Sequence, residues 1–338
     1  QGKKFLVIEP DGNNGDRLIY MGMEKKLKEV GIDYTVLRYR ETPWFSLIHK
    51  LYFGPWKRIL NVAKVASKSD KSLEIAIGKI DKRIYERTVR VNKICADPSL
   101  VILIHGGGNM NDLWHGLRLL RNVIRHNPNS IVIVGPQTYW FQETRFPQLF
   151  KCAKQEIYLF CREKYSYNLL NSMSLQENVH IHLSHDTTFY FSKKDFKLRE
   201  GGYDLICLRT DKESAIFRKK NNIKGLQKIE IKELRESPER VFIGDISLAL
   251  NFRNFVHLVE GSRRVYTDRL HVAILAALLG KDTTLYSNSY YKNKGVYEFS
   301  LSKYPNVTFV NDPKHLEAML KRAWGSVSDF ELPTDTNI

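Results

Sequence analysis

Short apolar runs alternate with segments of helical periodicity along most of this chain, and this alternation limits the fold more than any other feature of the sequence. The first apolar run covers residues 5–9, and a loop with glycines follows it at 10–15. Residues 16–30 then carry apolar side chains at helical spacing, and residues 34–37 form a second apolar run. The order strand, glycine loop, helix, strand predicts the beginning of a doubly wound α/β sheet.

The alternation occurs in two series, which predicts two α/β domains facing each other across a cleft. Further strands are expected at 100–104, 130–134, 157–160 and 179–183 in the first series, and at 203–208, 241–243, 264–266, 283–286 and 307–310 in the second. A charged, loop-like stretch at 192–202 separates the series. The predicted units are an N-terminal domain over 1–195, a C-terminal domain over 200–325 and a loose tail over 326–338.

The chain carries a surplus of basic residues, with 53 Lys and Arg against 37 Asp and Glu, or +16. This charge fits a polyanion, an acidic lipid surface or an anionic substrate, and a solvated basic surface without a specific partner explains it equally well. We interpret the basic stretch at about 44–93 as a helical insertion rather than a nucleic-acid surface. Because RGG tracts, zinc-finger spacing and RRM-type aromatic motifs are absent from the sequence, no specific nucleic-acid partner is expected.

The cysteines argue against a structural metal site. Cys95, Cys152, Cys161 and Cys207 lie far apart without CxxC spacing, which also argues against a disulfide-rich scaffold. The sequence has no Asp-x-Asp signature either, so we expect no tightly bound metal. No apolar run reaches the length of a membrane span, but the chain begins at Gln1 rather than Met, where a signal or anchor helix would fit before it.

Three loops at the carboxyl ends of predicted strands are candidates for ligand binding, because open α/β sheets bind ligands there. The first, at 11–16 (Asp-Gly-Asn-Asn-Gly-Asp), lets the backbone turn tightly and approach a ligand, and the next helix offers N–H groups to an anion. Asn13, Asn14 and Asp16 are its candidate side chains, although Asp16 is more simply explained as the helix N-cap. The loop matches neither GxGxxG nor GxxxxGK[ST], so neither a dinucleotide site nor a P-loop is predicted.

The second loop, at 105–112, contains three consecutive glycines after an apolar strand. Consecutive glycines are costly unless the backbone must pass close to something. Gly107, Gly108 and Asn109 could form a nest of main-chain N–H groups for a phosphate or an oxyanion, and the alternative is a tight packing corner.

The third loop, at 267–271 (Thr-Asp-Arg-Leu-His), leads into an apolar helix that Gly280 ends. Arg269 and His271 then lie in the first helical turn, where cations oppose the helix dipole. An anionic ligand would reverse this misfit: Arg269 can grip a carboxylate or phosphate through paired hydrogen bonds, and His271 can donate a proton. A buried structural histidine is the alternative for His271.

Single residues after other strands extend the set of candidates. Arg162 follows the strand at 157–160, where it can reach the cleft, although exposure at the surface explains its position equally well. Arg209 follows the first strand of the second domain, a good place for a cation that binds a ligand. Asp186 follows the strand at 179–183 and is either a catalytic base or a cap.

Taken together in chain order, these segments resemble the polysaccharide pyruvyl transferase family. The segments that carry the resemblance are 12–16 (Gly-Asn-Asn-Gly-Asp), 106–114 (Gly-Gly-Gly-Asn-Met-Asn-Asp-Leu-Trp), 135–138 (Gly-Pro-Gln-Thr), 162–166 (Arg-Glu-Lys-Tyr-Ser), Asp186, and 267–271 with the helix through Gly280 and Lys281. Each is short, and their order over residues 5–310 makes the resemblance specific. The chain departs from the common pattern at Asn111 and Glu163, where relatives often carry Gly and Asp.

The resemblance implies a fold like that of two-domain (GT-B-like) glycosyltransferases and phosphoenolpyruvate as co-substrate, with no tightly bound cofactor. The product it implies is a ketal in which pyruvate bridges two hydroxyls of one sugar. The chain most resembles the Golgi members of fission yeast that cap the terminal galactose of N-linked glycans, which implies a galactose-terminated acceptor, a 4,6-ketal and the Golgi lumen; a cytoplasmic bacterial enzyme is the alternative.

The resemblance and the physical reading of the residues agree on an anion site. Phosphoenolpyruvate needs several cations and N–H donors, which the expected donor-site residues supply: Arg162, Arg209, Arg269, Leu270, His271, Gly107, Gly108 and Asn109. The residues expected on the acceptor side or in its loops are Asn13, Asn14, Asp16, Asp112, Trp114 and Gln137. In the expected mechanism His271 protonates the methylene carbon while a sugar hydroxyl attacks, with Asp186 or Asp16 as base.

Two other functions are compatible with the sequence. A nucleotide-sugar-dependent glycosyltransferase is the first, because the implied fold often serves that chemistry. A non-catalytic protein that binds acidic polymers through its basic charge is the second.

Overall fold

The computed structural model contains two α/β domains and describes residues 3–9, 12–38, 99–114, 116–142, 144–209, 211, 213–214, 235–236 and 241–312. The insertion predicted at 44–93 and the tail predicted at 326–338 lie outside these residues. Within them, no helix combines the length and the apolar character that crossing a membrane requires.

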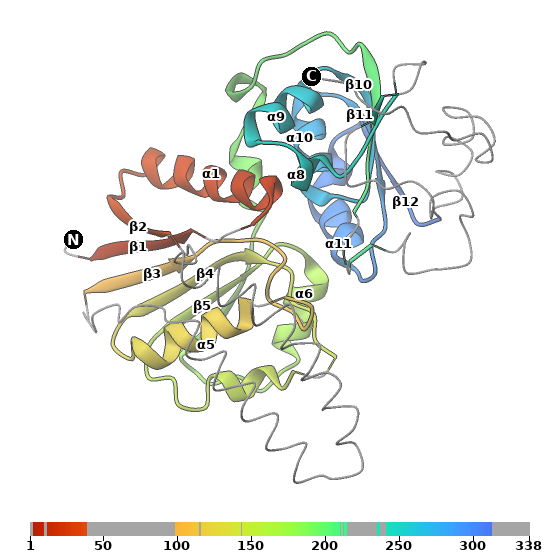
Figure 1. The fold of residues 1–338 in the computed structure, drawn as a ribbon. Helices are drawn as coiled ribbons and strands as arrows, with labels where there is room; N and C mark the ends of the chain where they lie inside the picture. Colours follow the sequence, from red (N-terminus) through yellow and green to blue (C-terminus); the bar gives the residue numbers. More distant parts are fainter. Residues whose placement is uncertain are drawn as a thin grey trace, which may run out of the picture.

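The N-terminal domain is built on a six-stranded parallel sheet (Figure 1). Its strands are β1 (Lys4–Glu9), β2 (Tyr34–Arg38), β3 (Leu100–Ile104), β4 (Ile131–Gln137), β5 (Ile157–Cys161) and β6 (Val179–Leu183). They lie in the order β2-β1-β3-β4-β5-β6, and every neighbouring pair is parallel. The doubly wound order predicted for this domain is confirmed.

Helices cover both faces of this sheet, because alternate strand residues point to opposite sides. Helix α1 (Asn14–Glu29) covers one face and buries Met23 against Val7 and Leu103. Helices α5 (Gly116–His126) and α6 (Lys164–Asn171) belong to the core on the other face, where Leu120 of α5 and Ile102 of β3 are both fully buried. Figure 1 shows α1 and α5 on opposite sides of the strands.

The C-terminal domain repeats this plan on a second six-stranded sheet. Its strands are β7 (Tyr203–Cys207), β8 (Arg235–Glu236), β9 (Val241–Ile243), β10 (Ser262–Thr267), β11 (Asp282–Tyr286) and β12 (Val307–Val310), in the order β12-β11-β10-β7-β9-β8. All pairs are parallel except β8 with β9. Its helices are α8 (Ile246–Ala249), α9 (Phe252–Glu260), α10 (Leu270–Leu279) and α11 (Lys292–Phe299). Two Rossmann-like domains of a GT-B-like fold are therefore present, as predicted.

Helix α10 is the most buried of the helices described in this domain. Every residue of it except His271 is buried. Gly280 ends it with a left-handed backbone (φ 74°), the conformation that glycine adopts at little cost. The helix begins at Leu270, so His271 stands in its first turn and Arg269 is its N-cap residue, close to the prediction.

Helix α1 joins the two domains. Its Leu18 belongs to the core of the C-terminal domain together with Leu275 of α10. Its Asn14 side chain donates a hydrogen bond to the carbonyl of Leu250 across the cleft, at 2.7 Å. The link from β6 to β7, which contains the boundary predicted at 195–200, also packs on α1: a Cβ on Gly22 would stand 2.2 Å from the carbonyl oxygen of Thr187. Only glycine permits this approach.

The strand orders place the predicted ligand loops opposite one another. In the first sheet the chain leaves β1 toward β2 on one side and returns at β3 on the other, and in the second it leaves β7 toward β9 and returns at β10. Ligands of open α/β sheets bind at such switch points, beyond the carboxyl ends of the strands. Both glycine loops lie at the first switch point, and Arg209 and Arg269 lie at the second.

Candidate active site

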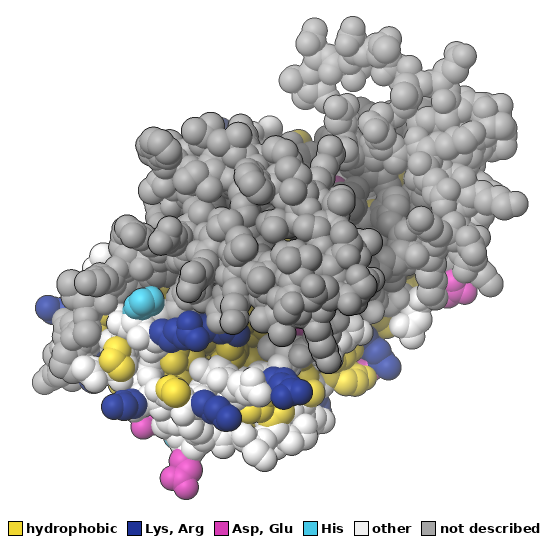
Figure 2. All heavy atoms as spheres, turned by 60° about the horizontal axis from the view of Figure 1, so that its bottom comes forward, with side chains coloured by type: hydrophobic (Ala, Val, Ile, Leu, Met, Phe, Trp, Pro, Cys, Tyr) yellow, Lys and Arg dark blue, Asp and Glu magenta, His cyan; other side chains and the backbone are white. Residues whose placement is uncertain are grey.

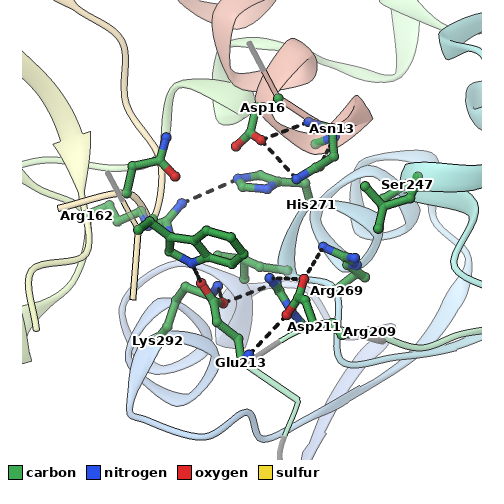
Figure 3. A pocket seen from close by; sticks show the side chains of 17 residues that line it. Asn13, Asp16, Arg162, Arg209, Asp211, Glu213, Ser247, Arg269, His271 and Lys292 are labelled. Carbon is green, nitrogen blue, oxygen red and sulfur yellow. Dashed lines mark hydrogen bonds and ion pairs between the residues drawn. The ribbon is translucent and has the colours of Figure 1, made fainter. Parts of the chain in front are cut away.

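A pocket of about 330 Å³ lies where the two switch points meet (Figure 3). It is lined by Gly12, Asn13, Gly15, Asp16, Gly108, Asn109, Trp114, Arg162, Arg209, Asp211, Glu213, Ser247, Leu248, Arg269, Leu270, His271 and Lys292. Ten of the residues predicted for the site are in this lining: Asn13, Asp16, Gly108, Asn109, Trp114, Arg162, Arg209, Arg269, Leu270 and His271. The remaining five, Asn14, Gly107, Asp112, Gln137 and Asp186, are not in the lining.

The loop before α1 presents a carboxylate to the pocket. Asn13, and not Asp16, is the N-cap: its side chain accepts from the N–H of Gly15 at 2.8 Å. The N-cap role expected for Asp16 was therefore wrong; its Oδ2 completes a capping box by accepting from the backbone N–H of Asn13 at 3.0 Å. No described residue donates to Asp16 Oδ1, so this oxygen can accept a ligand hydroxyl.

Gly15 of this loop leaves room for a neighbouring side chain. A Cβ on Gly15 would stand 2.9 Å from Nδ1 of His271, so glycine allows the first turn of α1 to pass beside the imidazole. Asn14 does not reach the pocket because its side chain forms the contact with Leu250 across the domains. Asn14 was expected on the acceptor side of the site, but in the structure it links the two domains.

The triple-glycine loop only partly fits the predicted nest. The N–H of Gly107 donates to the carbonyl of Pro136 at 2.9 Å, and the N–H of Asn109 donates to Gln137 Oε1 at 3.1 Å. These two groups are engaged within the protein, so the packing corner that was the alternative describes this part of the loop. Gly108 is different: a Cβ there would stand 3.1 Å from Nη2 of Arg162 and 3.6 Å from Nζ of Lys292.

Gln137 and Asp112 brace the loops and lie outside the lining. Gln137 is fully buried and also donates to the carbonyl of His105 at 2.9 Å. Asp112 accepts from the backbone N–H of Gln142 at 2.6 Å. Both therefore hold the loops around the pocket in place from outside its lining.

Arg162 brings an unpaired group to the pocket from the end of β5. Its side chain is fully buried; Nε donates to Thr138 Oγ1 and Nη1 donates to Asp186 Oδ2, both at 2.8 Å. Its Nη2 is buried and has no hydrogen-bond partner among the described residues. An unpaired buried donor is costly, so Nη2 at the pocket wall points to an anionic or carbonyl ligand.

Asp186 and His271 form a pair beside this arginine. His271 Nε2 lies 3.2 Å from Asp186 Oδ2 and 3.4 Å from Nη1 of Arg162. Burial alone would raise the pKa of Asp186, but His271 and Arg162 outweigh it and hold this pKa well below its usual range. Asp186 also caps the segment after it, accepting from the N–H of Thr188 at 2.9 Å. It is thus poorly suited as a base, and it fixes the imidazole instead.

Carboxylates of the protein already pair with Arg209 and Arg269, the two arginines of the C-terminal domain that line the pocket. Arg269 donates through Nε to Asp245 at 3.0 Å and lies 3.2 Å from Asp211. Arg209 pairs with Asp211 at 2.8 Å and with Glu213 at 3.2 Å. An anionic ligand was expected to offset Arg269 at the start of α10, but Asp245 and Asp211 already do so within the protein.

Lys292 and Glu213 were missed by the sequence analysis. Lys292 begins α11 and its ammonium group contacts the carboxylate of Glu213. Burial lowers the pKa of Lys292 to about 7, with Arg209 and Arg162 acting in the same direction and Glu213 opposing them. Burial would raise the pKa of Glu213, but Lys292 and Arg209 lower it to about 2. The sequence carried a signal for Lys292, because this charged residue follows the strand predicted at 283–286. The other candidates were chosen for the same position after a strand.

The site has the chemistry of an anion and proton-transfer centre. Arg162, Lys292 and the compensated arginines can bind negative charge, His271 can move a proton, and Asp16 can accept one. Among the described residues, no group of three or more His, Cys, Asp or Glu side chains could hold a metal ion.

Known proteins resemble this chain in sequence and in fold. A family model described as polysaccharide pyruvyl transferase matches residues 13–290. EpsO of Bacillus subtilis (strain 168), a candidate pyruvyl transferase, is 24% identical over 241 residues, covering 63% of this chain and 73% of that protein. The crystal structure of a functionally uncharacterised protein from Klebsiella pneumoniae subsp. pneumoniae is similar in fold, with a TM-score of 0.58, 23% identity and coverage of 92% and 94% of the two chains.

The family match extends over both domains and covers the residues that line the pocket from Asn13 to His271. It agrees with the resemblance seen in the ordered motifs, and the residues that carry those motifs meet at one site. This chain belongs to the polysaccharide pyruvyl transferase family.

Proposed function

We propose that this chain transfers pyruvate from phosphoenolpyruvate to two hydroxyls of a terminal sugar and releases phosphate. The observation that carries the proposal is the buried, unpaired Nη2 of Arg162, which faces Nζ of Lys292 across Gly108. A donor with a phosphate and a carboxylate on one carbon needs two or more cationic groups close together. The pocket supplies them with Arg209 and Arg269 nearby (Figure 3).

The proposed mechanism divides the proton transfers between the domains. Nε2–H of His271 donates to Asp186, and Nδ1 carries the proton to the methylene carbon of the donor, while the oxygen of one sugar hydroxyl bonds to the central carbon. Asp16 Oδ1 accepts the proton of that hydroxyl. The bond from carbon to the phosphate oxygen then breaks with its electron pair, and the second hydroxyl bonds to the same carbon and gives its proton to the departing phosphate.

The proposed acceptor is a terminal β-galactose with pyruvate across O4 and O6. This part of the proposal is supported by the resemblance to family members that act on galactose, and by the half-buried Trp114 in the lining, whose flat ring suits contact with a sugar. The Golgi lumen and the bacterial cytoplasm both stay predictions for the compartment.

The test is phosphate release from phosphoenolpyruvate by the purified chain with a terminal β-galactoside, with the pyruvylated product identified by mass spectrometry. Turnover that requires both substrates is expected, and a panel of nucleotide sugars should give none. Turnover of a nucleotide sugar with no reaction of phosphoenolpyruvate would establish a glycosyltransferase instead.

One surface feature favours a second candidate function, the binding of an acidic polymer. A groove of about 670 Å³, which shares no residue with the pocket, is lined by Arg121, Arg125 and Arg145. On the face that carries α5, lysine and arginine side chains lie among hydrophobic ones (Figure 2). Steeply salt-dependent binding to heparin that survives the loss of His271, in a chain without turnover, would establish this function.

Gly108→Ala tests the space between the two cations. The new methyl group would stand 3.1 Å from Arg162 Nη2 and 3.4 Å from Lys292 Cδ, so one cation must move by a few tenths of an ångström. We expect the Kd for phosphoenolpyruvate, measured by calorimetry, to rise about tenfold. The free energy of unfolding should stay within about 1 kcal/mol of the wild type, because alanine also restricts the unfolded chain.

Gly31→Ala is the matched control for that substitution. A methyl group at Gly31 meets nothing within 4 Å, but its φ of 69° strains any other residue. This variant should lose stability and keep its affinity for phosphoenolpyruvate. Unchanged affinity in Gly108→Ala would show that the donor does not use this space.

A further inference from the structure

Glu213 lies at the centre of the contacts around the anion pocket, and neither the sequence motifs nor the mechanism above uses it. Its side chain is 2% exposed and comes from the loop after β7. It lies 3.2 Å from Arg209 and contacts the ammonium group of Lys292, so it connects two cations of the pocket. Figure 3 shows these side chains converging on it.

The same carboxylate also reaches the opposite domain. Nε1–H of Trp114, from the loop after β3, donates to Glu213 Oε1 at 2.5 Å. The hydroxyl of Tyr290, just before α11, donates to this oxygen at 3.4 Å. One buried carboxylate thus touches Arg209 of its own loop, residues 290 and 292 at the start of α11, and Trp114 of the N-terminal domain, and all four of these neighbours offer donors.

The position of Lys292 explains why a carboxylate is needed there. The charged groups that face Lys292 are Glu213 and Arg209 from the loop after β7 and Arg162 from the end of β5, and the ring of Tyr290 lies 5.5 Å from Nζ. Two of these groups are cations, and the lysine is buried. Glu213 is the one carboxylate among the described residues that contacts the ammonium group, and this contact favours the charged form.

We propose that Glu213 is a positioning residue that holds Lys292 charged and in place beside Arg209 at the donor site, and fixes both to Trp114 of the opposite domain. The inference rests on the proposed function for the identity of the donor. It assigns Glu213 no contact with the substrate and no proton transfer.

Glu213→Gln separates the charge of this side chain from its shape, because the amide oxygen still accepts from Trp114. In the wild type the pKa of Lys292 is about 7. Without the carboxylate, this pKa falls further, and Lys292 is neutral over a wider pH range. Because the ionisation of phosphoenolpyruvate is the same for both proteins, the ratio of their Kd values reports on the protein alone.

We expect Glu213→Gln to bind phosphoenolpyruvate about tenfold more weakly than the wild type at about pH 8, the effect of one pKa unit. At about pH 5.5, where the lysine is charged in both proteins, the difference should largely disappear. Glu156→Gln, which removes a carboxylate paired with His180, is the control and should match the wild type at both pH values. A ratio that is equal at both pH values would reduce Glu213 to a structural role and overturn the proposal.

A double-mutant cycle with Lys292→Met shows whether Glu213 acts through the lysine. In that background, Glu213→Gln should no longer change the pH dependence of binding, and a change that persists would overturn the proposal. Inorganic phosphate is the second probe. Suppose that the wild type binds phosphate more tightly than Glu213→Gln, with the same pH dependence, but does not bind phosphoenolpyruvate. That result would refute the proposed donor and support the role of Glu213.

Discussion

Replacing His271 by Ala should lower kcat by about 10²–10⁴, the usual contribution of a general acid. The reason is geometric: Nε2 lies 3.2 Å from Asp186, and Nδ1 stands beside the glycine loop that lines the pocket. The fold should persist, because His271 is the one residue of α10 that is not buried. The measurement is phosphate release under saturating donor and acceptor, with thermal unfolding of the same samples.

His180→Ala is the control for this substitution. His180 pairs with Glu156 at 2.7 Å on the edge strand β6, and it is not in the lining of the pocket. It should keep wild-type turnover. A His271→Ala variant with near-wild-type kcat would exclude the imidazole as the acid and leave protonation of the methylene carbon to another group.

Replacing Arg162 by Met should have the largest combined effect on binding and stability. Met fills a similar volume but removes the guanidinium from a pair in which both side chains are 0% exposed. Breaking a buried ion pair costs about 3–5 kcal/mol, because the remaining charge is left uncompensated. We therefore expect a loss of this size in the free energy of unfolding by denaturant, together with the loss of measurable binding of phosphoenolpyruvate.

The double variant Arg162→Met with Asp186→Asn separates the loss of stability from the loss of phosphoenolpyruvate binding. Neutralising Asp186 removes the buried charge, so much of the stability should return. Binding should not return, because the unpaired Nη2 is still missing. If the double variant regained binding, the weak affinity of the single variant would be due to misfolding, and Arg162 would have no direct contact with the donor.

The fold followed from the sequence because its strands are short, apolar and regularly spaced. Runs such as 100–104 and 157–160 lie where β3 and β5 were found, since parallel strands covered on both faces are apolar throughout. Helix α10 was also predicted within a few residues because its apolar stretch stops at Gly280. The position of the site followed in turn from the loops at the ends of these strands.

The partners of the charged residues did not follow from the sequence. Periodicity reports which side chains are buried, but not which carboxylate meets which cation. Asp245 is 24 positions from Arg269, and Glu213 is 79 positions from Lys292. No local pattern connects either pair. For this reason the sequence predicted an anionic ligand as the partner of Arg269, whereas the structure shows Asp245 and Asp211 beside it.

Helix α1 has a mechanical consequence for catalysis. It is tied to the first sheet by its chain and to the second core by Leu18, so it is a natural axis for rotation of one domain against the other. Asp16 and His271 lie next to this axis, in the first turns of α1 and α10. Trp114 and Glu213 come from the loops after β3 and β7 and meet across the cleft. If one domain rotates about α1, the contact between Trp114 and Glu213 would open, whereas Asp16 and His271, the proposed proton acceptor and donor, would keep their spacing.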